Sequence, residues 1–201
     1  KYDKYFKYFN PDLFDAREWA RQAKAAGMKY AVLTTKHHEG FCMWDTQYTD
    51  YKCTNTPAGR DLVREYVDAF RAEGLHVGFY YSLIDWHHPE FPIDRLHPRR
   101  DDPDAEEQSR GRDVHKYAEY MRNQVTELLT NYGKIDVLWF DFSYSAPDPQ
   151  DKPWMKGKGK EDWEAEELLA LARRLQPGII IDNRTEIEQD IWTPEQFQPT
   201  E

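Results

Sequence analysis

The most constraining feature of the sequence is a unit that occurs four times, in which an amphipathic segment ends at a glycine and a short apolar run follows. The runs are rich in β-branched and aromatic residues and show almost no polar alternation. That composition is typical of strands buried on both faces of a parallel sheet. The runs cover 30–34, 77–81, 135–140 and 179–181, and the glycines before them are Gly27, Gly74, Gly133 and Gly178.

The segments between the runs have the periodicity and ends of helices. Asp15, with Glu18 three residues later, matches a capping box at the start of the first helix. Apolar residues recur at helical spacing over 62–70 and 114–128, and a fourth helix is predicted over 164–175. Helices that alternate with parallel strands predict an α/β protein.

Two α/β architectures fit this order, an open doubly wound sheet and a (β/α) barrel. No glycine-rich phosphate loop or P-loop follows any run, which removes the commonest reason to favour the nucleotide-binding open sheet. Four units are about half of the eight in a TIM-type barrel, which usually needs ~250 residues. We therefore predict a single domain over 1–201, an incomplete TIM-type barrel with about four β/α units. Degenerate strands hidden in 48–59 and 85–112 are the alternative.

Composition narrows the function. The net charge of −10, from 37 acidic and 27 basic residues, would repel phosphate backbones and anionic membranes, so neither nucleic acid nor a membrane is expected as a partner. No stretch approaches the ~18 consecutive apolar residues of a membrane span. The aromatic content of 15% suits a carbohydrate site, where ring faces stack on sugars. Cys42 and Cys53 are too few for a disulfide framework and have no His or Cys partners at zinc-site spacing.

Polar residues suited to catalysis follow the carboxyl ends of all four runs, the edge that carries the active site in barrel enzymes. Asp141 closes the third run, where a carboxylate needs either partners or a cavity. It is our candidate nucleophile. Trp139, two residues earlier, could wall a sugar pocket, and Arg184 after the fourth run could hold the carboxylate ionised.

His37 and His38 follow the first run. Adjacent residues on an extended strand point to opposite faces, so the pair is a poor metal chelate without a bend. Uncharged imidazoles that hydrogen-bond sugar hydroxyls are the more economical interpretation, because each ring offers one donor and one acceptor.

Hydrolysis of a glycosidic bond with retention needs a second carboxyl group ~5 Å from the first, to protonate the leaving oxygen. The downstream candidates share only their position after the fourth run, and spacing alone does not choose among them. They are Glu186, Glu188, Glu195 and Glu201.

Several segments together resemble the α-L-fucosidases of glycoside hydrolase family 29, in family order and over nearly the whole chain. The hallmark is residues 29–41, KYAVLTTKHHEGF. The further matches are TDY at 49–51, GRDLV at 59–63, GFYYS at 78–82, WFD at 139–141 and TPEQ at 193–196.

The resemblance implies a (β/α) barrel and exo-acting, retaining hydrolysis of terminal α-L-fucose from glycans or aryl fucosides through a fucosyl-enzyme ester, with no cofactor. Asp141 matches the nucleophile and Glu195 best matches the acid/base. The positions that match substrate-binding residues are His37, His38, Tyr81, Trp139 and Arg184.

The chain departs from the family pattern in two places, since neither the Ile-His-Trp-Gly motif of the first barrel strand nor a Glu-Trp-Tyr segment occurs. A truncated, non-catalytic fucose-binding remnant is therefore the alternative function. An interrupted barrel would expose strand edges and apolar faces, which predicts that copies self-associate into a homo-oligomer. The expected partner is a fucosylated oligosaccharide or glycoconjugate.

Overall fold

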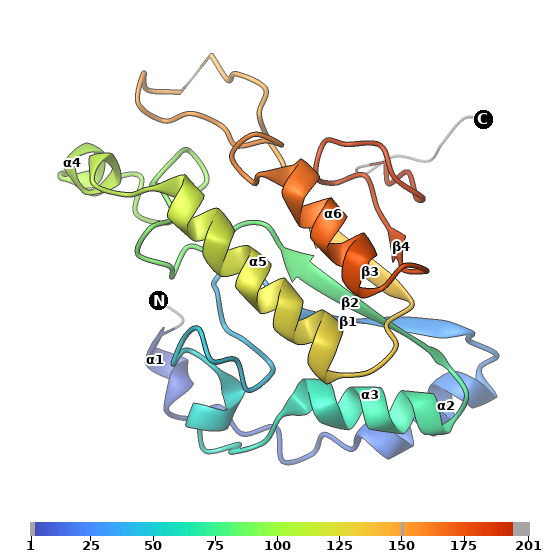
Figure 1. Ribbon diagram of the computed structural model, residues 1–201. Helices are drawn as coiled ribbons and strands as arrows, with labels where there is room; N and C mark the ends of the chain where they lie inside the picture. The colour runs from blue at the N-terminus through green and yellow to red at the C-terminus, as the bar shows by residue number, and fades with distance from the viewer. Residues whose placement is uncertain (1–2, 150, 195–201) are drawn as a thin grey trace.

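A computed structural model describes residues 3–149 and 151–194 and contains one parallel sheet of four strands in the order β1-β2-β3-β4 (Figure 1). The strands are β1 (Tyr30–Lys36), β2 (His76–Ser82), β3 (Val137–Asp141) and β4 (Ile180–Ile181). Each strand pairs with the next one along the chain, as in successive units of a barrel.

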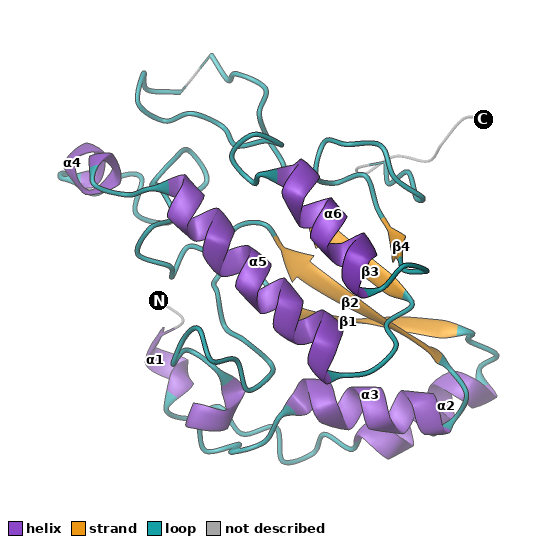
Figure 2. Cartoon of the chain, in the orientation of Figure 1, coloured by secondary structure: helices purple, strands orange, loops and turns teal. Residues whose placement is uncertain are grey.

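Helices alternate with these strands as predicted (Figure 2). The long ones are α2 (Ala16–Ala25), α3 (Leu62–Ala72), α5 (Val114–Asn131) and α6 (Ala165–Leu175), and the short ones are α1 (Asp3–Phe6), the 3₁₀ turn η1 (Cys53–Asn55) and α4 (Ala105–Arg110). Helix α3 contacts α2, β1 and β2, while α5 and α6 pack side by side. In Figure 1, α5 and α6 cross one face of the sheet.

The helix ends follow the local chemistry of the chain. The Asp15 carboxylate accepts hydrogen bonds from the Arg17 and Glu18 amides and caps α2. Glu18 does not return the bond, because its carboxylate accepts from Arg21 and Gln22 instead, so half of the predicted capping box forms. Three of the four predicted glycine stops have the positive φ that glycine tolerates best, at Gly27, Gly74 and Gly133.

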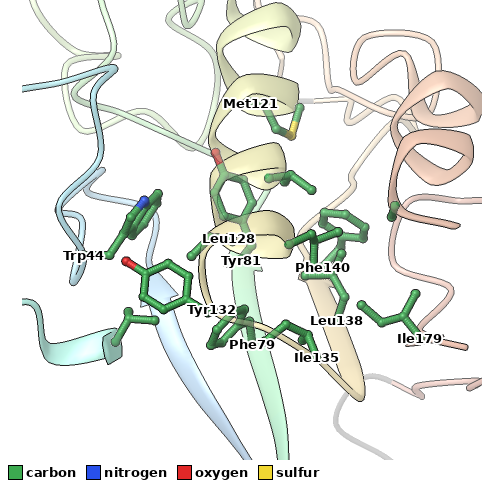
Figure 3. Close-up of a cluster of buried hydrophobic side chains, with 14 of the residues drawn as sticks. Trp44, Phe79, Tyr81, Met121, Leu128, Tyr132, Ile135, Leu138, Phe140 and Ile179 are labelled. Atoms are coloured by element: carbon green, nitrogen blue, oxygen red, sulfur yellow. The ribbon is translucent and has the colours of Figure 1, made fainter. Parts of the chain in front are cut away.

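The hydrophobic core lies between the sheet and the helices (Figure 3). Strand residues that face the helices are completely buried, among them Phe79, Tyr81, Leu138 and Phe140. The opposite face of the sheet is open, and Tyr30 at the start of β1 is 57% exposed. The strands are therefore covered by helices on one face only, whereas their composition predicted burial on both.

The segments proposed as hidden strands are not strands. Residues 48–59 contain η1, and 85–112 contain α4 and turns. The nearest approach to a strand is an isolated bridge between Cys42 and Lys52. None of the helices in the part of the chain described is long and apolar enough to cross a membrane.

Candidate active site

The carboxyl ends of the strands meet at one edge of the sheet, as the parallel order requires. Ser82, at the end of β2, is in register with Asp141 at the end of β3, and the Leu83 amide donates to the Asp141 carbonyl over 2.8 Å. The Ser82 hydroxyl lies 2.6 Å from Nδ1 of His38, which follows β1. These bonds join the residues that follow β1, β2 and β3, and the Phe140 amide, which donates to Oδ1 of Asp182, joins the residues that follow β4.

Asp141 is half-buried, and its Oδ2 accepts a 2.7 Å hydrogen bond from the Tyr80 hydroxyl. Burial, and then this bond to a carboxylate, raise the pKa of Tyr80 above its ordinary value. Tyr80 therefore remains a phenol that donates to Asp141 across the working range of most enzymes. The bond orients the carboxylate at the open face of the sheet.

The tyrosine beside Asp141 is not the one that sequence comparison indicated. Tyr81 is completely buried among the helices, and its hydroxyl donates to Oε1 of Gln124 over 2.8 Å. Side chains alternate along a strand, so Tyr80 shares the open face with Trp139, its partner in register. Alternation places Tyr80 and Tyr81 on opposite faces, but only the register of β2 against β3 decides that Tyr80 is the one beside Trp139.

The two histidines lie together, and the expectation that they face opposite sides is wrong. Their ring centroids are 4.0 Å apart, and His37 is stacked on Tyr80 with 5.7 Å between centroids and 13° between planes. The physical reason is that β1 ends at Lys36, after a register irregularity at Thr34, so His37 and His38 are not extended strand residues.

His38 is an uncharged ring in this position. Burial, and then the neighbouring His37, lower the pKa of His38 to about 4. Trp86 and Phe142 pack edge-on against it at 5.4 and 5.3 Å between centroids. A neutral imidazole held by Ser82 offers one donor or one acceptor to a sugar hydroxyl.

A buried ion pair that sequence reasoning missed lies beneath the histidines. Nζ of Lys36 is 3.1 Å from Oδ2 of Asp85, and both side chains are excluded from water. Oδ1 of Asp85 accepts from the amides of His87 and His88, so one carboxylate ties the end of β1 to the loop after β2. A lysine at the end of an apolar strand was the available signal, because buried charges need partners.

Asp182 and Arg184 follow β4. Asp182 is fully buried, and its Oδ1 accepts from the Phe140 amide over 3.0 Å. Burial raises the pKa of Asp182 to about 7. Nε of Arg184 donates to Oγ1 of Thr193 over 2.7 Å, and its positive charge acts on Tyr80 and Asp182. Arg184 thus belongs to the same strand-end cluster as Tyr80.

Two of the four acid/base candidates, Glu186 and Glu188, lie within the described residues. Glu195 and Glu201 lie outside the described residues. The carboxylate of Glu186 accepts hydrogen bonds from Ser145 and from the Lys160 amide, which ties it to the loop after β3. Glu188 is exposed. Among residues 3–149 and 151–194 no group of three or more His, Cys, Asp or Glu could hold a metal ion.

A family model described as alpha-L-fucosidase matches residues 1–201. The chain belongs to the α-L-fucosidase family. It is 34% identical over 177 residues to a putative alpha-L-fucosidase 1 of Oryza sativa subsp. japonica, which covers 86% of this chain and 28% of that protein. This chain therefore spans under a third of the length of that curated relative.

Solved α-L-fucosidases have the same fold. Isoenzyme 1 of Paenibacillus thiaminolyticus is 60% identical, with a TM-score of 0.81 over 92% of this chain and 41% of that one. A family 29 enzyme of Bacteroides thetaiotaomicron, trapped as a covalent intermediate with 2-fluoro-fucosyl fluoride, is 34% identical, with a TM-score of 0.72 over 93% and 38%. The four strands are thus part of a (β/α) barrel, as predicted.

Proposed function

We propose that this protein is a retaining, exo-acting α-L-fucosidase in which Asp141 is the nucleophile. The observation that carries the proposal is the Asp141 carboxylate at the carboxyl end of β3, held by the hydroxyl of Tyr80, whose ring stacks on His37. Family membership and the trapped covalent intermediate of the Bacteroides relative support a fucosyl-enzyme ester.

In the first step the ionised Asp141 attacks the anomeric carbon of fucose as the bond from that carbon to the leaving oxygen breaks. Glu195 gives its proton to the leaving oxygen. In the second step the Glu195 carboxylate takes a proton from water, and the resulting hydroxide equivalent attacks the same carbon. The ester bond then breaks and returns Asp141 as a carboxylate, so the anomeric configuration is retained.

The position of Thr193 supports Glu195 as the acid/base. The Thr193 amide donates to Oδ1 of Asn183 over 3.1 Å, and its hydroxyl accepts from Arg184. The described chain therefore reaches the end of β4 two residues before Glu195. In the proposed site Arg184 contributes positive charge beside the carboxylates.

Sugar binding is assigned to the remaining residues of the open edge. His37 and His38 hydrogen-bond fucose hydroxyls, and the pKa of His38 near 4 keeps that ring uncharged. Trp139 shares the open face with Asp141 and supplies an aromatic wall. The substrate is a fucosylated oligosaccharide or glycoconjugate.

A chromogenic aryl α-L-fucoside tests the proposal. Asp141→Ala is expected to lower kcat by about 10⁴-fold, because the nucleophile is lost. Asp68→Ala is the matched control, since this carboxylate is 63% exposed and its nearest ionic partner is Arg64 at 3.9 Å. If Asp141→Ala keeps wild-type turnover, the assignment of the nucleophile is wrong.

The alternative is a fucose-binding protein without turnover, in which His37, His38 and Trp139 hold the sugar. Calorimetry with L-fucose separates the two. Heat of binding that disappears in His37→Ala, with no hydrolysis of the aryl fucoside, would support the binding protein.

The open sheet face supports the further proposal that copies self-associate. Tyr30 and Ile180, on the two edge strands, are 57% and 42% exposed. Apolar surface and unpaired edges of this kind drive association. Size-exclusion chromatography with light scattering should give a dimer or larger species at micromolar concentration, and a stable monomer would contradict this proposal.

A further inference from the structure

The last hydrogen bond that holds the β3 backbone before Asp141 comes from a side chain. Between β3 and β4 the strand register ends at Leu138 and Ile181. Beyond that point the Phe140 amide donates to Oδ1 of Asp182 over 3.0 Å, in place of a strand carbonyl. On the other side, β2 still holds the Asp141 carbonyl through the Leu83 amide.

Burial and the surrounding backbone hold the Asp182 side chain in this position. Its side chain is completely buried, and its second oxygen, Oδ2, has no hydrogen-bond partner among the described residues. The backbone around it is fastened by a parallel bridge between Asp182 and Ile191. Burial of a carboxyl group with one oxygen unsatisfied costs free energy, so its presence here calls for an explanation.

We infer that Asp182 is a positioning residue for the nucleophile, which fastens the end of β3 by accepting the Phe140 amide and so fixes the Asp141 carboxylate. The inference rests on the proposed role of Asp141. Asp182 touches the backbone one residue before the nucleophile, so it acts through Asp141 and not on the sugar.

Burial and the charged groups around Asp182 together set the protonation state of its carboxyl group. Asp141 on β3 repels a negative charge on Asp182, and Arg184 on its own segment attracts one. On the adjoining return segment, Asp190 is paired with Arg173. Burial outweighs the attraction and raises the pKa of Asp182 to about 7. Below that pH the group is neutral and spares Asp141 a second negative neighbour.

Two substitutions separate the acceptor from the charge. Asp182→Asn keeps an oxygen acceptor of the same shape and is neutral at every pH. Asp182→Leu has similar bulk but no acceptor. We expect Asp182→Asn to keep kcat within about threefold of wild type below pH 7, and Asp182→Leu to lower kcat by tenfold or more with KM little changed. Circular dichroism verifies that both variants are folded.

Amide hydrogen exchange at Phe140 gives a readout that needs no catalysis. The amide should be equally protected in the wild type and in Asp182→Asn, and should exchange at least tenfold faster in Asp182→Leu, while the Leu83 amide, bonded to Asp141, stays protected. If the wild type fails to cleave the aryl fucoside, the proposed function fails. Exchange at Phe140 still tests whether Asp182 accepts a hydrogen bond from that amide. Unchanged kcat in folded Asp182→Leu, or equal damage from both variants, would overturn the inference.

Discussion

Asp85→Asn tests whether the buried ion pair beneath the histidines holds the fold together. The substitution removes the negative charge 3.1 Å from Nζ of Lys36 but keeps an oxygen that can accept from the His87 and His88 amides. Lys36 then stays fully buried beside the Tyr117 hydroxyl, 3.2 Å away, and the ring faces of Tyr81, Tyr117 and Tyr120, with no ion-pair partner among the described residues.

The expected loss is about 3–5 kcal/mol of the free energy of unfolding, the cost of breaking a buried pair by removing one partner. For a chain of this size that loss corresponds to a fall in Tm of about 10 °C. Urea denaturation followed by tryptophan fluorescence measures the free energy, and a thermal melt measures Tm. Lys36→Met combined with Asp85→Asn should recover part of the loss, because no buried charge then lacks a partner.

The control is a pair of the same kind on the surface. Arg110 and Glu106 are 3.0 Å apart, with side chains 74% and 54% exposed. Arg110→Ala should cost under about 1 kcal/mol, since water screens such pairs. The reasoning is refuted if Asp85→Asn costs no more than Arg110→Ala, or if the double variant is less stable than Asp85→Asn alone.

Two further predictions concern the side chains at the open edge. Tyr80→Phe removes the donor to Asp141 and should lower kcat/KM for an aryl fucoside by about tenfold or more, the value of a hydrogen bond to a charged group. The control is Tyr81→Phe in the core, which should lower stability instead of kcat/KM. Equal kinetic effects of the two substitutions would contradict the assignment of Tyr80. The pKa of His38 is about 4 when folded and near its ordinary 6.5 when unfolded, so its contribution to stability is complete above pH 6.5 and is lost as the pH falls toward 4. Urea titrations at pH 7 and pH 5 should therefore show a smaller loss in His38→Gln than in the wild type, and identical losses would refute the low pKa.

Much of the fold could be predicted because the relevant signals are local. The apolar runs and the helical spacing follow from residues close in sequence, and they predicted the order of the strands and helices within a few residues. Strands in parallel order bring their carboxyl ends to one edge, which is why Asp141, His37 and His38 were expected together. Strand boundaries were less certain: β1 continues to Lys36, and β3 begins at Val137, after Ile135 and Asp136.

The site residues that sequence reasoning missed depend on contacts between distant parts of the chain. Lys36 and Asp85 are 49 residues apart, and Asp182 reaches back 42 residues to Phe140. Nothing beside Asp182 in the sequence indicates that its partner is a backbone amide. The error at Tyr81 has a different cause, because a match to a motif does not say which of two adjacent tyrosines faces the site.

The sequence by itself determined that this protein alternates helices with parallel strands, and that its carboxylate, histidines and arginine lie at one edge, because chain direction and periodicity are local properties. Only the tertiary structure decided which side chains meet there. It paired Tyr80 with Asp141, buried Lys36 against Asp85 and placed Asp182 behind the nucleophile strand. Burial and the partner of each charge are set by packing between segments, and that packing sets the pKa of His38 and of Asp182.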